Sequence, residues 1–226
     1  MRIKGVIFDM DGLMFDTERI AQLSLDYAQE VLGIDLRTGL PDMKGMNAAL
    51  VRQVQMEHFG PNFDYEGVQA VRSAFRRKYI QEHGIKVKPG LRELISELRL
   101  RGLKWAMATS SSAQVAEENL RCAQLLEDFP IRVCGDMVER SKPDPQIFYT
   151  AAKLLHTHPE ETLVLEDSYN GIRAAAAGGF LPGMVPDLQQ PDEEICSLLV
   201  RKFDTLMDVI PFLSEMDKDV DTLCIS

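Results

Sequence analysis

Apolar runs and amphipathic repeats alternate along most of the chain. Short apolar runs, rich in β-branched or aromatic residues, predict strands at 3–8, 104–108, 131–134, 162–165 and 181–185. Helical repeats predict helices at 18–32, 47–59, 65–83, 91–101, 113–126, 145–155, 170–177 and 206–216. Because strands that alternate with helices form right-handed crossover units, the pattern predicts an α/β fold. Its parallel sheet would be covered by helices on both faces.

One segment interrupts this alternation. Between the first strand and residue 84 the pattern is helical throughout. We therefore expect a core domain made of residues 1–15 and 85–226, with a small all-helical domain, residues 16–84, inserted over the carboxyl edge of the sheet. Such an insertion could close over a ligand and exclude water. A helical layer packed rigidly on the sheet is the alternative, and the pattern does not separate the two.

The charge balance narrows the choice of partners. The 226 residues carry 25 Lys and Arg against 35 Asp and Glu, a net charge of −10. This charge argues against nucleic acid and anionic membrane surfaces as partners. No apolar run has the length of a signal peptide or a membrane span, and the 4 cysteines lack metal-ligand spacing. We expect a cytoplasmic protein with reduced thiols, either a monomer or a weak homodimer.

The end of the first strand carries the first candidate chemistry. There the apolar run meets Asp9, Asp11 and Gly12. Open α/β folds bind ligands at the carboxyl edge of the sheet. Glycine invites a turn after Asp11, so the two acids can take different roles around one bound ion. A strand that simply runs into a polar turn is the alternative.

Two further strand ends supply hydroxyls and a lysine. Thr109 and Ser110 precede a helix, where hydroxyls and free amides can hold phosphate oxygens, although such residues are also common helix caps. Lys142 lies between prolines in a loop that gives its ammonium a fixed direction of approach. It could neutralise a carboxylate or a phosphoryl oxygen, or it could be a solvated loop lysine.

A fourth strand end repeats the design of the first. Its apolar run opens into Glu166 and Asp167. Together with Asp9, these carboxylates would make an all-oxygen site, which suits Mg²⁺. Each of the four signals is weak alone, but their order, each at the end of a predicted strand, makes the combination strong.

The four motifs resemble those of the haloacid dehalogenase superfamily, in its group with a helical cap inserted after the first strand. The resemblance extends to about residue 187 and implies a Rossmann-like core. Within the superfamily the chain looks most like the sugar-phosphate phosphatases and β-phosphoglucomutase-like proteins. The runs that support this are Asp16-Thr17, Lys44-Gly45, Gly171-Ile-x-Ala-Ala and Val185-Pro186-Asp187.

The resemblance implies a Mg²⁺-dependent phosphatase that hydrolyses a small phosphate monoester, a sugar phosphate or nucleoside monophosphate. Its catalytic residues would be Asp9 as the nucleophile that forms an aspartyl-phosphate, Asp11 as acid and then base, and Lys142. Mg²⁺ would bind Asp9, the backbone carbonyl of Asp11 and Asp167, with Glu166 in or near its shell. These roles fit the chemistry, because phosphoryl transfer depends on positioning and charge neutralisation.

Five residues are expected to bind the substrate. Thr109 and the amide of Ser110 would hold the phosphoryl oxygens by resemblance, and Thr17, Ser111 and Asn47 are further candidates. The implied partner is a small phosphorylated metabolite.

A β-phosphoglucomutase must also hold a second phosphate at the far end of its substrate. Where that family carries an arginine, a Lys-Asn pair and a histidine, this chain has Ala48, Ser112-Ala113 and Ala21. We therefore expect no charged group there, only small hydroxyls such as Ser111, and predict a phosphatase acting on a monophosphate. A mutase is the first alternative. A non-catalytic phosphate-binding regulator is the second, and the presence of all four motifs disfavours it.

Overall fold

The computed structural model describes residues 3–41 and 43–223. In these residues the strands are β1 (Gly5–Phe8), β2 (Lys104–Thr109), β3 (Arg132–Cys134), β4 (Thr162–Glu166), β5 (Leu181–Met184) and β6 (Arg201–Lys202). The helices are α1 (Thr17–Leu32), α2 (Ala48–Phe59), α3 (Tyr65–His83), α4 (Leu91–Leu100), α5 (Ala113–Cys122), α6 (Gln146–Leu155), α7 (Tyr169–Ala177), α8 (Glu193–Leu198) and α9 (Val209–Leu223).

The strands form one parallel 6-stranded sheet in the order β3-β2-β1-β4-β5-β6. β1 lies at the centre, so that Phe8 pairs with Met107 of β2 on one side and Leu165 of β4 on the other. The carboxyl ends of these three strands therefore meet at one edge. The strands β2 and β3 lie on one side of β1, and β4, β5 and β6 lie on the other, so the strand order reverses between β1 and β4. Open α/β sheets bind ligands at the carboxyl ends of the strands beside such a switch point.

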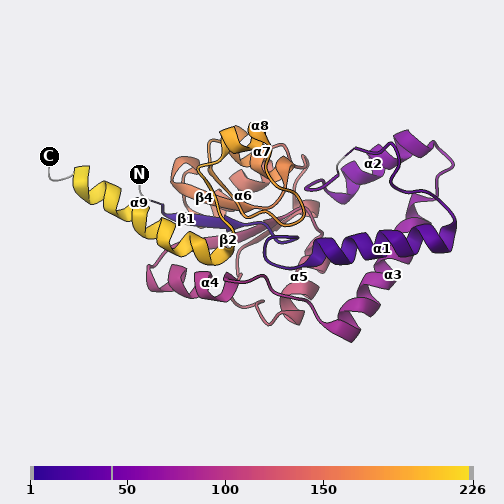
Figure 1. Ribbon diagram of the computed structural model, residues 1–226, viewed down its shortest axis with the longest axis horizontal. Coiled ribbons are helices and arrows are strands. Elements are labelled where there is room, and N and C mark those ends of the chain that lie inside the picture. The colour runs from indigo at the N-terminus through magenta and orange to yellow at the C-terminus, as the bar shows by residue number, and fades with distance from the viewer. Residues whose placement is uncertain (1–2, 42, 224–226) are drawn as a thin grey trace.

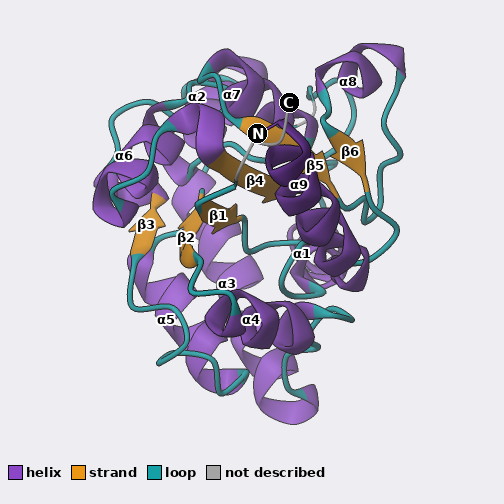
Figure 2. Cartoon of the chain, turned by 90° about the vertical axis from the view of Figure 1, so that its left-hand side faces the viewer, coloured by secondary structure: helices purple, strands orange, loops and turns teal. Residues whose placement is uncertain are grey.

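Alternate residues of β1 enter hydrophobic cores on opposite faces of the sheet. Val6 and Phe8 belong to one core, together with buried side chains of α4, α5 and α9. Ile7 belongs to the other, together with α6 and α7. Figure 2 shows the strands between these two sets of helices. The arrangement confirms the predicted α/β fold with a Rossmann-like parallel sheet.

The helices α1, α2 and α3 lie together beyond the carboxyl edge of the sheet, on the right of Figure 1. α1 packs along α3, and a small core that includes Ala28, Leu36 and Val68 joins them. We call α1–α3 with their connecting loops the helical layer. As the sequence pattern predicted, the described part of residues 16–84 contains helices and no strand.

The element boundaries differ from the predicted ones in the second half of the chain. The helix α8 and the strand β6 are additional to the predicted elements. The strand has no sequence signal, because it consists of two exposed basic residues at the sheet edge and has no apolar run. α5 ends at Cys122 rather than near 126, and Gln124 just beyond it has a positive φ of 56°. α9 begins at Val209 and continues to Leu223. Within the described ranges, no helix combines the length and apolar character needed to cross a membrane.

Two leucines of α4 test the predicted orientation of this helix. Leu98 is fully buried in the core, whereas Leu100 is 83% exposed. Leu98→Ala should lower the free energy of unfolding by about 3 kcal/mol, because it removes buried methyl groups and leaves a cavity. The matched change Leu100→Ala should alter it by less than about 0.5 kcal/mol. Urea denaturation measures both, and equal losses would contradict the orientation.

Candidate active site

The carboxyl ends of β1, β2 and β4 bring the predicted acids and hydroxyls together. Asp9 directly follows β1, Thr109 is the last residue of β2, and Glu166 is the last residue of β4. Because β1 lies in register between its two neighbours, these three residues occupy adjacent positions at one edge. All three are buried, and so is Asp167.

Lys142 lies at the centre of this group. Its ammonium donates to Asp9 Oδ1 and Glu166 Oε1, each at 2.6 Å, and to the carbonyl of Ala108 at 3.3 Å. Burial alone would lower the pKa of Lys142, but the charges of Asp9 and Glu166 outweigh burial and raise that pKa above its ordinary value. Lys142 is therefore a protonated, buried lysine whose ammonium is held by three hydrogen bonds, not a solvated loop lysine.

The acids Asp9, Glu166 and Asp167 have oxygens that all lie within 4.8 Å of one another. Burial, followed by the charge of Glu166, raises the pKa of Asp9 and of Asp167 well above that of an ordinary aspartate. Lys142 offsets only part of this negative charge. A divalent cation would offset the rest, and a buried set of carboxylate oxygens fits Mg²⁺.

The carboxylate of Glu166 is already engaged. Its Oε1 accepts from Lys142, and its Oε2 accepts from the amide of Ser168 at 3.2 Å and from the Ser168 hydroxyl at 2.9 Å. A metal ion would therefore find its freest oxygens on Asp9 and Asp167, while Glu166 holds the lysine in place.

Gly12 permits the close approach of the first and fourth strand ends. It has a φ of +84°, and a Cβ at this position would lie 2.2 Å from Asp167 Oδ2. The residue thus permits both the turn after Asp11 and the close contact with Asp167. Any side chain at position 12 would displace Asp167.

Asp11 has surroundings different from those of Asp9. It is half-buried, and its Oδ1 accepts from Thr17 Oγ1 at 2.7 Å. Its Oδ2 accepts from Ser111 Oγ at 2.7 Å and from Thr109 Oγ1 at 3.4 Å. Neutral hydroxyls therefore surround this carboxylate, whereas a lysine contacts Asp9. Two acids that lie two residues apart can consequently perform different tasks.

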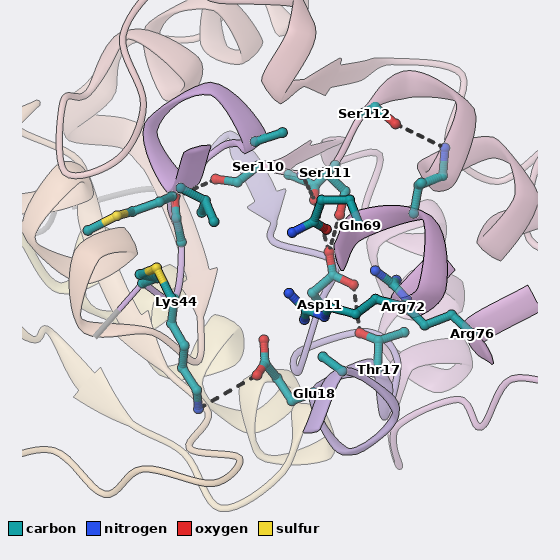
Figure 3. Close-up of a pocket in the computed structure, with 18 of the residues that line it drawn as sticks. Asp11, Thr17, Glu18, Lys44, Gln69, Arg72, Arg76, Ser110, Ser111 and Ser112 are labelled. Carbon is teal, nitrogen blue, oxygen red and sulfur yellow. Dashed lines mark hydrogen bonds and ion pairs between the residues drawn. The ribbon is translucent and has the colours of Figure 1, made fainter. Parts of the chain in front are cut away.

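A cavity of about 490 Å³ opens between the sheet edge and the helical layer. Asp9, Asp11, Asp167 and all of the predicted hydroxyls, those of Thr17, Thr109, Ser110 and Ser111, line it. Figure 3 shows Asp11 beside Thr17 and Ser111 in this cavity.

Asn47, a predicted substrate-binding residue, does not line the cavity. Its side chain caps α2 by accepting from the amide of Leu50 at 3.0 Å and donates to the carbonyl of Gly135 at 3.4 Å. Both contacts are structural, so the geometry gives no support to a role of Asn47 in binding substrate.

The loop that precedes α2 joins the helical layer to the strand ends. Ser110 Oγ donates to the carbonyl of Gly45 at 2.5 Å, and Asn170 Nδ2 donates to the carbonyl of Lys44 at 2.7 Å. The amide of Asn47 donates to Ser141 Oγ at 2.6 Å. Hydrogen bonds thus attach residues 43–47 to the loops after β2 and β3 and to the first turn of α7, and we call this contact the seam.

The uncharged residues at the mutase positions, Ala21, Ala48 and Ser112, line the cavity as expected, but charged side chains that were not predicted line it too. Arg72 and Arg76 of α3 line the cavity, together with Gln69 and Ser73 of the same helix. These arginines belong to α3, whereas the positions that hold the second phosphate in the mutases correspond to other segments of the chain. The polar residues 69, 72, 73 and 76 share one face of α3 at helical spacing, which is the signal that could have revealed them.

Comparisons with known proteins agree with this geometry. The family model of haloacid dehalogenase-like hydrolases matches residues 3–179. The chain is 32% identical to the phosphorylated carbohydrates phosphatase of Thermotoga maritima, over 79% of this chain and 82% of that protein. It is 26% identical to the N-acetylmuramic acid 6-phosphate phosphatase of Pseudomonas putida, over 79% and 81% of the two chains.

A solved structure of a hydrolase from Pseudomonas syringae superposes with a TM-score of 0.80 at 25% identity, over 94% of this chain and 98% of that one. The family match and the named phosphatases confirm the predicted resemblance and the predicted class of enzyme, a phosphoric monoester hydrolase. The chain belongs to the haloacid dehalogenase-like hydrolase family.

Proposed function

We propose that this enzyme is a Mg²⁺-dependent phosphatase that hydrolyses a small phosphate monoester, a sugar phosphate or a nucleoside monophosphate, through an aspartyl-phosphate on Asp9. The observation that carries the proposal is the unequal pair of acids in one cavity. Asp9 is held by Lys142 through Oδ1, and Asp11 is held by the hydroxyls of Thr17 and Ser111. Phosphoryl transfer to a carboxylate needs one acid as nucleophile and a separate one to handle protons.

In the proposed reaction Asp9 uses its second oxygen, Oδ2, because Oδ1 accepts from Lys142. Attack of this oxygen on phosphorus forms a new O–P bond, while the bond to the leaving oxygen breaks. Asp11, in its protonated form, gives that oxygen a proton. Asp11 then takes a proton from water, which attacks the phosphorus of the aspartyl-phosphate and restores the Asp9 carboxylate.

We assign the phosphoryl oxygens to Thr109, to the amide of Ser110 and to Lys142. The hydroxyls of Thr17 and Ser111 hold Asp11 directly, so their proposed role is to position this acid beside the ester. The ammonium of Lys142 lies between Asp9 and Glu166, where it would neutralise charge as the phosphoryl group arrives.

We assign Mg²⁺ to Asp9, the backbone carbonyl of Asp11 and Asp167. Glu166 lies next to this set and contacts it through Lys142. When bound, the ion supplies positive charge that screens the phosphoryl oxygens from the carboxylates and allows the anionic ester to approach.

We also propose that the chain is divided as the sequence suggests, into a core domain of residues 1–15 and 85–226 and a helical cap domain of residues 16–84. The separate small core of α1 and α3 supports this division, as does the position of the cavity between the helical layer and the sheet edge. The crossings near residues 15 and 85 run side by side, since Phe15 bridges to Val87.

Replacement of the two acids tests the reaction. Asp9→Asn removes the nucleophile and should lower phosphate release from sugar and nucleoside monophosphates by about 1,000-fold or more. Asp11→Asn removes the proton carrier and should lower it by about 100- to 10,000-fold. Steady-state phosphate release with Mg²⁺ measures both.

The exposed Asp204 provides the matched control, because Asp204→Asn makes the same chemical change at a residue that does not line the cavity. This variant should keep wild-type activity. Equal activity of the wild type and Asp9→Asn on every ester would contradict the proposed function.

Metal binding should depend on pH. Because burial and Glu166 raise the pKa of Asp9 and Asp167, protons stay bound in the folded state at pH values where the unfolded chain has lost them. The stability of the metal-free protein should therefore fall as the pH rises from about 4 through these raised pKa values. Mg²⁺ competes with the same protons, so its stabilising effect should grow over this window.

Thermal unfolding with and without Mg²⁺ at about pH 5 and about pH 8 measures this effect. The shift in melting temperature should be larger at the higher pH, and Asp167→Asn should reduce it. An equal shift at both pH values, or one that Asp167→Asn leaves intact, would place the metal ion elsewhere.

A further inference from the structure

The cavity has two chemically different walls. One is the sheet edge with the acids and hydroxyls of the proposed reaction. The other is α3, from which Tyr65, Glu66, Gln69, Arg72, Ser73 and Arg76 line the cavity. Glu66, the acid of this wall, pairs with Arg52 at 3.2 Å. Figure 3 shows the side chains of Arg72 and Arg76 extending from α3 into this space. We call these two residues the arginine pair.

In the part of the chain that the structure describes, no acid lies within ion-pair distance, 4.0 Å, of either guanidinium group of the arginine pair. Arg72 Nε donates to Ser24 Oγ at 3.4 Å, and Ser24 in turn donates to the carbonyl of Ala21 at 2.7 Å. This contact uses only Nε of Arg72, and the described residues make no hydrogen bond to its two terminal nitrogens. Among residues 3–41 and 43–217, neither arginine forms an ion pair.

The positive charges of the arginine pair are also close enough to repel. Burial lowers the pKa of Arg72, and the charge of Arg76 lowers it further. Tyr65 and, to a smaller extent, Glu18 act on the pKa of Arg72 in the opposite direction, but each effect is smaller than that of Arg76. The Glu18 carboxylate also lies 3.9 Å from the Lys44 ammonium. An anion bound between the two guanidinium groups would remove this repulsion.

The geometry of the donors narrows the ligand. A guanidinium is a planar fork of N–H donors that matches two oxygens of a carboxylate or phosphate. The two arginines are four residues apart in α3, so they are neighbours on one helix face and can act on one group together. The positive charge of the two arginines could also compensate the acids of the cavity at long range. That explanation does not account for two forked donors that lie beside each other on one helix face.

We propose that Arg72 and Arg76 bind a second anionic group, a carboxylate or a phosphate, at the end of the substrate remote from its scissile ester. They would thereby select phosphorylated acids or bisphosphates over neutral sugar phosphates. This inference rests on the proposed function, because it places the scissile phosphate at Asp9.

Two matched ligand pairs test the inference. The pair 6-phosphogluconate and sorbitol 6-phosphate differs in one end group, a carboxylate against an alcohol. The pair fructose 1,6-bisphosphate and fructose 6-phosphate differs in one phosphate. Dissociation constants are measured by calorimetry with Mg²⁺ on the full-length Asp9→Asn protein, in which the ligands stay intact.

The diacidic member of at least one pair should bind about tenfold or more tightly than its partner. Arg72→Gln and Arg76→Gln should each remove most of this preference and leave the neutral ligand nearly unaffected. The pair that shows the preference identifies the group as a carboxylate or as a phosphate.

Arg77 offers the matched control, because it is the next residue of α3, is exposed and does not line the cavity. Arg77→Gln removes the same charge and should keep the preference. If a glutamine variant fails to fold, Arg72→Lys and Arg76→Lys keep the charge but lose the fork, and they should retain only part of the preference.

Equal affinity within both pairs would overturn the inference, and so would a loss of preference in Arg77→Gln as large as in Arg72→Gln.

Phosphate release by the wild-type enzyme separates a failure of this inference from a failure of the proposed function. Hydrolysis of neutral esters without any preference would sink the inference alone. Selective binding of the diacids without hydrolysis of any ester, including both pairs, would sink the proposed function alone. Conversion of a monophosphate into its isomer without net phosphate release would instead identify a mutase that uses the pair for its second phosphate.

Discussion

The buried contact of Lys142 with Asp9 and Glu166 is the interaction on which the site depends. Three buried carboxylates at one sheet edge repel one another, and the lysine lies 2.6 Å from two of them. Loss of one partner from a buried ion pair costs about 3–5 kcal/mol, because a charge is left without compensation. The fold supplies what this contact requires. The central position of β1 brings Asp9 beside Glu166, and the loop after β3 carries Lys142 between them.

The strand ends could be predicted from the sequence because their signal is local. An apolar run that opens into Asp9 and Asp11, or into Glu166 and Asp167, marks both the strand and the polar edge at its end. The parallel topology then follows from the alternation of strands and helices. The position of Lys142 could be predicted only in combination with the other three strand ends, since a lysine in a loop has no periodic signal of its own.

The wall formed by α3 shows where such reasoning ends. Helical periodicity predicts which residues share a face, but not whether that face meets solvent, core or cavity. Arg72 and Arg76 face the cavity only because α3 packs on α1 beyond the sheet edge, a placement fixed by distant contacts such as those of Val68 with the small core. Asn47 illustrates a second ambiguity. A polar residue at the start of a helix can bind a ligand or cap the helix, and here its oxygen accepts from the amide of Leu50.

In the seam, main-chain groups attach the helical layer to the core, whereas other residues of the same loop line the cavity. On the side of the helical layer, its contacts use the backbone carbonyls of Lys44 and Gly45 and the backbone N–H of Asn47. Every residue has such a carbonyl, and every residue except proline has such an N–H. The side chains of Met43 and Met46 in the same loop face the cavity instead. Substitutions at these two positions can therefore reshape the wall of the cavity while the main-chain hydrogen bonds persist. For protein engineering, substitutions in this loop can change ligand specificity while the hydrogen bonds that attach the helical layer remain.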